Sequence, residues 1–236
     1  MMKRNSLTSS RELEKKSNII CGIDEAGRGP VLGPMVISGV CINYDQLDLL
    51  SQLGVKDSKK LSQTKRKSLS EKINEICTCK SFIVNPDEID KRIDLKISLS
   101  RLEQLKMAEI INLLKPDVIY IDAADVNEKR FGHSMHDLLI YTPSKLISKH
   151  KADDTYPIVS AASIIAKDTR DRLIAELHGK YGDFGSGYTS DEKTIDYLTK
   201  WIQKHRKAPD FARKSWNTVK RILESEVLTR KITDFI

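Results

Sequence analysis

Short runs of apolar, often β-branched residues recur through the first half of the chain, and each has the length of a strand. These runs cover residues 18–23, 34–42, 80–84 and 118–121, and an alternating polar and apolar pattern covers 145–149. Continuous apolar runs of this length predict buried strands, whereas the alternation predicts a strand at the edge of the sheet. Glycines between the first two runs predict a tight connection.

Segments with apolar residues three or four positions apart predict amphipathic helices. Leucines and isoleucines form such a stripe along 98–114, and Pro116 closes it. Thr189 and Glu192 fit a capping box that opens a helix through about Lys204. Further helices are predicted over 64–77, 157–177 and 216–228. Because strands come first and helices accumulate later, the predicted fold is α/β, a mixed sheet flanked by helices, with a helical C-terminal segment.

Composition narrows the class of protein. The 236 residues are 39% hydrophobic and 31% charged, which is typical of a globular chain with room for one large domain and a small appendage. Apolar runs remain shorter than the roughly 18 residues of a membrane span, and the polar first 17 residues do not resemble a signal peptide. The four cysteines form no Cys-x-x-Cys pair, so we expect buried thiols in a reducing, cytoplasmic compartment and no membrane association.

The net charge of +7 is distributed unevenly. Residues 1–17 carry five basic and two acidic side chains, and residues 193–236 carry eleven basic and five acidic ones. The body between them holds 24 basic and 26 acidic residues. Basic ends around a slightly acidic body favour a polyanionic partner that is held by the ends.

Acidic residues follow the predicted strands. Asp24 and Glu25 come after the first strand, Asp122 ends another, and Asp153 precedes the long helix that starts near Pro157. Converging carboxylates repel one another unless a proton or a cation lies between them, and oxygen ligands without paired His or Cys suit Mg²⁺ or Mn²⁺. The alternative is that some of the 33 acids lie at strand ends by chance.

Ordered motifs then connect the chain to a known family. They read GIDEAGRGPVLGP at 22–34, DSKKL at 57–61, YIDAADV at 120–126, KHKADD at 149–154, PIVSAASIIAK at 157–167, GSGYTSD at 185–191 and RKSW at 213–216. This set resembles ribonuclease HII, the type 2 ribonuclease H, and is most similar to its archaeal branch. The resemblance covers about residues 18–225.

The resemblance implies an RNase H-like mixed sheet and a metal-dependent endoribonuclease that acts as a monomer. Such an enzyme would hydrolyse RNA in RNA–DNA hybrids and incise 5′ to single ribonucleotides embedded in duplex DNA, leaving 3′-hydroxyl and 5′-phosphate ends. Its expected roles are ribonucleotide excision repair and RNA primer removal. The family's four acids fall on Asp24, Glu25, Asp122 and Asp153, which would hold two Mg²⁺ or Mn²⁺ ions with Asp24 bridging the pair. Asp125 and Asp154 are expected to be solvated or to support these ligands.

The resemblance also implies how RNA is distinguished from DNA. Backbone groups of Gly27, Arg28 and Gly29 would read the 2′-hydroxyl, the group that separates the two sugars. Tyr188 would pack on the following deoxyribose and help to sense the hydroxyl. A plain tight turn and an ordinary surface tyrosine are the alternatives.

Several charged residues have less defined roles. Lys59 and Lys60 are expected to include a backbone-phosphate contact, or else to form a solvated charge run. Lys151 and Lys167 could contact phosphate or balance the acids. Asp168 stands where the family usually has an apolar residue, and a local pair with Arg170 or Arg172 would offset its burial.

The predicted organisation is a flexible basic extension (1–17), a catalytic domain (18–185), a helical substrate-binding segment (186–228) and a tail (229–236). Ile232 and Phe235 give the tail a partial likeness to a sliding-clamp-binding peptide, although Thr229 replaces the usual Gln and Ile236 the second aromatic. The alternative is a short apolar terminus that fills a core or a crystal contact. At the level of the whole chain, a non-catalytic hybrid-binding module would have lost a ligand acid, and a resolvase or integrase would need no 2′-hydroxyl sensor.

Overall fold

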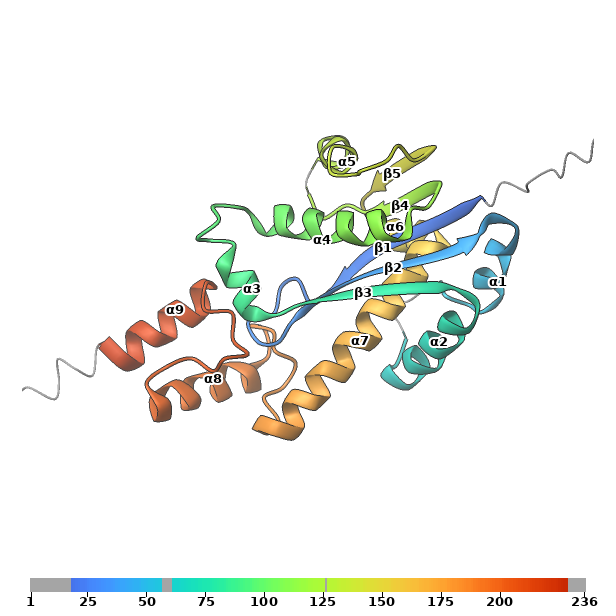
Figure 1. The fold of residues 1–236 in the computed structure, drawn as a ribbon. Coiled ribbons are helices and arrows are strands. Elements are labelled where there is room, and N and C mark those ends of the chain that lie inside the picture. Colours follow the sequence, from blue (N-terminus) through green and yellow to red (C-terminus); the bar gives the residue numbers. More distant parts are fainter. Residues whose placement is uncertain (1–17, 57–60, 126, 229–236) are drawn as a thin grey trace, which may run out of the picture.

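A five-stranded mixed sheet forms the centre of the molecule (Figure 1). The computed structural model describes residues 18–56, 61–125 and 127–228. The strand order is β3-β2-β1-β4-β5, in which β1, β2 and β3 are antiparallel neighbours while β4 and β5 run parallel to β1. The strands are β1 (Ile19–Ala26), β2 (Met35–Asn43), β3 (Thr78–Val84), β4 (Val118–Asp122) and β5 (Lys145–Lys149). The predicted mixed sheet is therefore confirmed, and β5 lies at its edge as expected.

Helices cover both faces of the sheet and continue beyond it. They are α1 (Leu47–Gln52), α2 (Gln63–Ile76), α3 (Pro86–Lys91), α4 (Leu99–Leu114), α5 (Glu128–His136), α6 (Ala152–Thr155), α7 (Pro157–Tyr181), α8 (Glu192–His205) and α9 (Asn217–Leu223). A 3₁₀ turn, Tyr44–Gln46, precedes α1, and a π-helical turn, Glu224–Leu228, follows α9. None of the helices in the described part of the chain combines the length and the apolar character needed to cross a bilayer.

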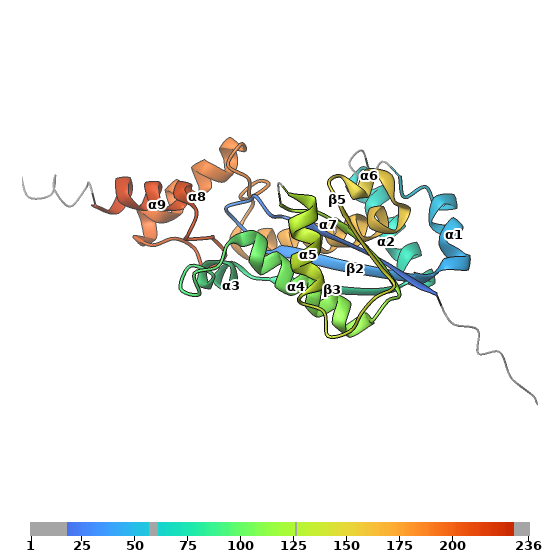
Figure 2. The ribbon, with the colours of Figure 1, turned by 90° about the horizontal axis from the view of Figure 1, so that it is seen from above.

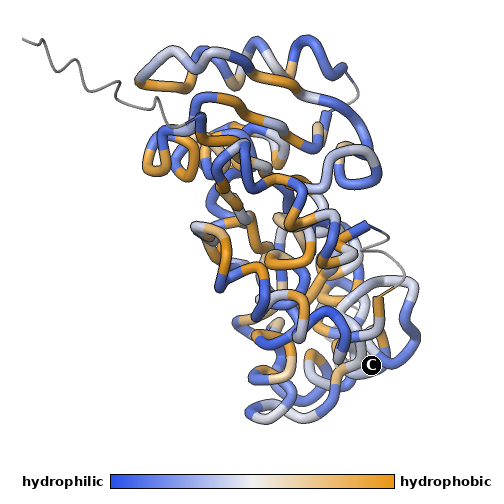
Figure 3. Tube along the Cα trace, turned by 90° about the vertical axis from the view of Figure 1, so that its right-hand side faces the viewer, coloured by the Kyte–Doolittle hydropathy of each residue, from blue (hydrophilic) through white to orange (hydrophobic). Residues whose placement is uncertain are grey.

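The alternation of side chains along β1 assigns its residues to two cores. Cys21 and Ile23 face α4 and pack with the odd-numbered residues of β4, whereas Ile20 faces α7. Figure 2 shows the sheet with α7 and α2 on one side and α4 on the other. Hydrophobic stretches of the chain concentrate in the interior and polar ones follow the outer turns (Figure 3).

The C-terminal helices form a third core at one end of the sheet. Phe184, Leu198 and Ile202 pack there with Val31 and Leu32 of the β1–β2 connection. Backbone hydrogen bonds join the same parts: the N–H of Gly33 donates to the carbonyl oxygen of Phe211 at 2.8 Å. The helical C-terminal segment is thus packed directly against the glycine-rich connection.

Three sequence expectations need correction. β1 continues through Ala26, so Asp24 and Glu25 lie within the strand and not after it. Helix α8 is capped by Asp191, whose side chain accepts from the N–H of Lys193, so the predicted capping box with Thr189 at its start was wrong. The last predicted helix is regular only through Leu223.

Candidate active site

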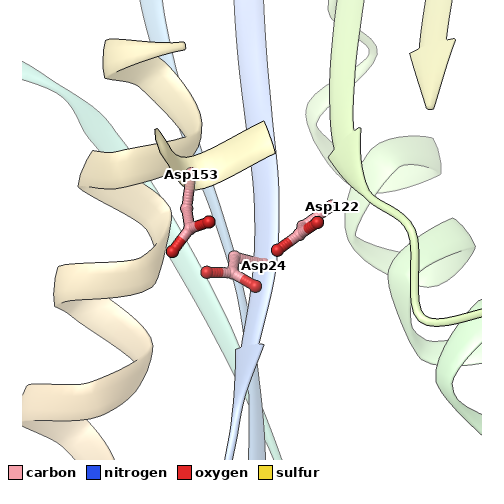
Figure 4. A group of neighbouring side chains, drawn as sticks. All are labelled: Asp24, Asp122 and Asp153. Atoms are coloured by element: carbon pink, nitrogen blue, oxygen red, sulfur yellow. The ribbon is translucent and has the colours of Figure 1, made fainter. Parts of the chain in front are cut away.

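Three aspartates from separate elements converge at the sheet (Figure 4). Asp24 lies in β1, Asp122 ends β4 and Asp153 lies in α6, and one carboxylate oxygen from each lies within 4.8 Å of the others. The parallel register pairs Ile23 with Ile121, so the next residue of each strand reaches the same place on the same face. The structure therefore brings three of the predicted acids together.

Asp122 also fixes the position of α6. Its Oδ1 accepts from the N–H of Ala152 at 3.2 Å, and the hydroxyl of Ser160 in α7 donates to the carbonyl oxygen of Asp153. Lys151, just before α6, has φ = 53°, a left-handed conformation that turns the chain from β5 into the helix. These contacts hold Asp153 over the end of β4.

Burial and like charge make this arrangement costly without a cation. Asp24 and Asp153 are each 5% exposed. Burial, and then the charge of Asp122, raise the pKa of Asp24 to about 7, whereas hydrogen bonds from Ser163 and the N–H of Glu25, together with Lys167, act in the opposite direction. Three carboxylates in this setting fit a hard divalent cation such as Mg²⁺ or Mn²⁺.

Glu25 is adjacent to this group but is not one of its three members. Successive strand residues alternate between the two faces of a sheet, and the charge of Glu103 on α4 acts on Glu25 as well as the charges of Asp24 and Asp122. Burial and the charges of Asp24, Glu103 and Asp122 raise its pKa well above the ordinary value, and its Oε2 has no hydrogen-bond partner among the described residues. The structure therefore groups three of the four predicted ligands, and a ligand role for Glu25 stays a prediction.

The predicted sugar-reading residues lie together beside the aspartates. A Cβ built on Gly29 would lie 3.7 Å from a ring carbon of Tyr188, and Tyr188 is 39% exposed. A pocket of about 380 Å³ joins them, and its lining comprises residues 25–29, Arg66, Lys167, Arg170, Asp171 and Tyr188. The guanidinium of Arg170 lies 5.4 Å from the centroid of the Tyr188 ring.

The side chain of Arg28 extends from the Gly-Arg-Gly turn to helix α4. Its Nε donates to Oε1 of Glu103 at 2.7 Å and its Nη2 to the hydroxyl of Ser100 at 3.1 Å, both on α4. Burial raises the pKa of Glu103 to about 7 although Arg28 and Arg213 oppose this shift. The side chain of Arg28 thus holds the loop to α4, and its carbonyl oxygen accepts from Arg213, which leaves its N–H for a ligand.

Sequence reasoning gave Arg213 no role, although it lies in the quoted RKSW motif. Its side chain is fully buried, and its guanidinium donates to the carbonyl oxygens of Gly33 at 3.1 Å, Arg28 at 2.7 Å and Gly27 at 2.5 Å. A buried arginine contradicts the usual solvent preference of this residue, so composition alone could not have located it. The motif was the one available signal.

The other predicted residues are placed as follows. Asp125 forms an ion pair with Arg130, and Asp154 is exposed, so neither belongs to the group of three. Lys167 donates to the hydroxyl of Ser163 at 2.7 Å.

Asp168 is half-buried in a groove between α2 and α7. Among the described residues, neither Arg170 nor Arg172 forms an ion pair with it. The guanidinium of Arg170 instead donates to the carbonyl oxygen of Ser186 at 3.4 Å, so the expected local pair was wrong. Lys59, Lys60, Ile232 and Phe235 lie outside the described residues.

Comparison with known proteins now identifies the family. The family model for ribonuclease HII matches residues 21–219. A ribonuclease HII of Methanococcus maripaludis is 44% identical over 237 residues, covering 99% of this chain and 98% of its own, and one of Pyrococcus abyssi is 46% identical over 208 residues, covering 87% and 91%. The crystal structure of ribonuclease H2 from Pyrococcus horikoshii superposes with a TM-score of 0.83 at 43% identity, covering 88% of this chain and 98% of that one.

A structure of a PCNA:RNase HII complex from Archaeoglobus fulgidus matches with a TM-score of 0.79 at 42% identity, over 86% of this chain and 96% of that one. A Bst-RNase HIII structure in complex with Mn²⁺, at 20% identity and a TM-score of 0.74 over 89% of this chain and 70% of that one, shares the fold. The expected RNase H-like fold and metal-dependent hydrolase class are confirmed, and the chain belongs to the ribonuclease HII family, whose members cleave RNA–DNA hybrids.

Proposed function

We propose that this ribonuclease incises duplex DNA 5′ to a single embedded ribonucleotide, besides hydrolysing RNA in hybrids, and leaves 3′-hydroxyl and 5′-phosphate ends. The observation that carries the proposal is the juxtaposition of two features at one place. The grouped carboxylates of Asp24, Asp122 and Asp153 lie next to a pocket that contains Gly27, Gly29 and Tyr188. The first can hold cations for phosphodiester hydrolysis and the second can contact a sugar.

The three aspartates and Glu25 are the proposed ligands of two Mg²⁺ or Mn²⁺ ions, with Asp24 shared between them. When bound there, two such ions would supply an activated water and charge stabilisation for the leaving oxygen of an in-line displacement. The chain's own contribution is placement: Asp24 lies within β1, and Asp122 accepts a hydrogen bond from the N–H of Ala152 in α6. Lys167 lies near enough to Asp24 to lower its pKa, and so limits the negative charge around the ions.

The sugar reader consists of backbone groups of Gly27, Arg28 and Gly29 together with Tyr188. Gly27 has φ = 79°, a conformation that favours glycine, and the absence of a Cβ at Gly29 leaves the approach to the Tyr188 ring open. Tyr188 is exposed enough to stack on a deoxyribose without a change in the fold. An enzyme that requires the 2′-hydroxyl would ignore duplex DNA without ribonucleotides.

The duplex itself is expected to lie along the basic C-terminal segment 186–228. That attraction is sequence-blind and weakens as salt rises. Lys59 and Lys60 are proposed to contact backbone phosphates. Residues 18–185 are proposed as the catalytic domain, and residues 1–17 as an additional basic arm. The proposed cellular roles are excision repair of ribonucleotides and removal of RNA primers. The enzyme is proposed to act as a monomer in the cytoplasm.

A sliding clamp is the proposed protein partner, bound through Ile232 and Phe235 in the tail 229–236. The support is the partial motif in the sequence and the PCNA complex of the similar Archaeoglobus fulgidus protein. Calorimetry of the clamp with the full chain and with a chain ending at residue 228 tests this. Deletion should abolish binding, whereas equal affinity of the two chains would refute the proposal.

The substrate proposal is tested by comparing two duplexes of one sequence, one with a single ribonucleotide and one entirely of DNA. Cleavage should be confined to the first and should stop when a chelator removes divalent ions. Cleavage of both duplexes would refute the requirement for a 2′-hydroxyl.

A further inference from the structure

The loop between β1 and β2 is held on both sides by the C-terminal segment. The N–H groups of Val31 and Leu32 both donate to the carbonyl oxygen of Gly187, at 2.8 and 3.2 Å. On the other side the N–H of Arg213 donates to the carbonyl oxygen of Val31 at 2.9 Å. The loop that carries the proposed sugar reader is therefore fixed by residues about 160 to 180 positions later in the chain.

The side chains of the RKSW motif contact every carbonyl of the Gly-Arg-Gly turn. Arg213 donates to the carbonyl oxygens of Gly27 and Arg28, and Nε1 of Trp216 donates to that of Gly29 at 3.2 Å. The guanidinium of Arg213 also lies 5.1 Å from the centroid of the Trp216 ring. Three consecutive peptide groups thus have their acceptors fixed by two side chains.

Fixing these carbonyls also fixes the neighbouring donors. A trans peptide is planar and its N–H points opposite its C=O, so the carbonyl of Gly27 sets the direction of the Arg28 N–H, and the carbonyl of Arg28 sets that of the Gly29 N–H. These two N–H groups donate to no acceptor among the described residues. They are consequently directed away from Arg213 and are available to a ligand.

The surroundings of Arg213 explain how its charged guanidinium is accommodated in the interior. Glu103, whose side chain is fully buried, accepts from Arg28, and its negative charge is also near Arg213. A buried guanidinium requires hydrogen-bonded partners, and here three carbonyl oxygens supply them while the charge of Glu103 lies nearby. The arginine fork fits this task because its donors lie in one rigid plane, whereas a lysine ammonium cannot bridge the same carbonyls in a fixed geometry.

We infer that Arg213, assisted by Trp216, is a positioning residue that aims the N–H groups of Arg28 and Gly29 at the 2′-hydroxyl. This inference rests on the proposed function. It makes recognition of the ribonucleotide depend on the C-terminal segment, because that segment supplies both side chains. Loss of the contacts should affect discrimination between RNA and DNA before it affects general affinity for a duplex.

The test is R213K in the full chain, with R172K as the matched control, since Arg172 is an exposed arginine on α7. Binding is measured with Ca²⁺ as the only divalent ion, for a duplex with one ribonucleotide and for the all-DNA duplex. The readout is the dissociation constant for the all-DNA duplex divided by that for the duplex with one ribonucleotide. We expect R213K to reduce the wild-type ratio by about tenfold, the effect of losing one or two directed hydrogen bonds, with all-DNA affinity little changed. R172K should keep the ratio.

A merely structural role would lower the melting temperature and leave that ratio unchanged in the folded fraction. Should R213K fail to fold, W216F decides instead, since it removes the indole N–H donor and keeps an aromatic ring at this position, and it should reduce the ratio in the same direction. A wild-type ratio near one would refute the proposed reading of the 2′-hydroxyl, and the role of Arg213 with it. A wild-type ratio well above one that the folded variant retains would refute the positioning role alone and leave the proposed function standing.

Discussion

Gly22 of β1 and Ile158 of α7 approach so closely that a Cβ built on Gly22 would lie 2.3 Å from the carbonyl oxygen of Ile158. The first turn of α7 is therefore seated on the backbone of β1. Gly22 lies two residues before Asp24, and Ile158 lies five residues after Asp153. A glycine at this position allows the helix to bring Asp153 over the strand that carries Asp24.

Replacing Gly22 should damage both the fold and the site. The added methyl of G22A meets backbone atoms that cannot rotate away, so we expect a loss of about 2–3 kcal/mol in the free energy of unfolding and a much lower cleavage rate. Urea denaturation and initial rates measure the two effects. G179A is the control, because a Cβ there meets nothing within 4 Å and alanine favours the helix by about 1 kcal/mol. Equal stability of G22A and wild type would contradict the close packing.

The metal assignment predicts that D24N and D122N lose cleavage and keep hybrid binding, because each removes a charged ligand without removing the basic surface. Rates of hybrid cleavage and binding in a gel-shift assay check this. D154N should retain the wild-type rate, since Asp154 is exposed and outside the group of three. Retained turnover in D24N and D122N would refute the assignment.

The raised pKa of Asp24 predicts a pH dependence of stability in the metal-free protein. Its pKa of about 7, against the ordinary 3.8, means that the folded state holds this proton more tightly than the unfolded state does. Its contribution to stability is therefore fully present below about pH 4, declines as the pH rises toward 7, and is constant above that, with a total of up to about 4 kcal/mol. Chemical denaturation of wild type and D24N in a chelator, from pH 4 to 8, isolates the effect.

The difference in unfolding free energy, wild type minus D24N, should fall over that interval. Adding Mg²⁺ should restore wild-type stability at pH 8 and have a smaller effect on D24N, since the cation replaces the proton between the carboxylates. A difference that does not change with pH would contradict the buried, repulsive setting of Asp24.

Tyr188 should contribute to sugar recognition and little to stability. Y188F keeps the ring and removes the hydroxyl, so we expect a decrease of several-fold in the cleavage of a single embedded ribonucleotide, and Y188A should decrease it further. The melting temperature of both variants should stay close to wild type because the side chain is 39% exposed. Cleavage by Y188A at the wild-type rate would exclude the sensor role.

Much of the sheet could be predicted from the sequence because its strands are continuous apolar runs. The short helices α1, α3, α5 and α6 could not, since four to nine residues carry too little periodicity to distinguish a helix from a loop. The start of α8 was misassigned because two residues in the same stretch, Thr189 and Asp191, can each cap a helix, and the tertiary contacts decide between them.

The site shows the same division between local and long-range information. Asp24 and Asp122 could be singled out because each directly follows an apolar run that predicts a strand. Strand alternation separates Glu25 from Asp24, but only once β1 is known to continue through Ala26. Arg213 could not be assigned, because its three carbonyl partners lie 180 or more positions earlier in the chain.

The central claim, that three grouped aspartates act beside a reader of the 2′-hydroxyl, is tested most directly by mapping the cut in a duplex with one ribonucleotide. The strand that contains it is labelled at its 5′ end, incubated with the protein and Mg²⁺ or Mn²⁺, and its product is sized to the nucleotide. A single product that ends with a 3′-hydroxyl immediately 5′ to the ribonucleotide is the predicted result. A cut elsewhere, or an equal cut in the all-DNA duplex, would contradict it.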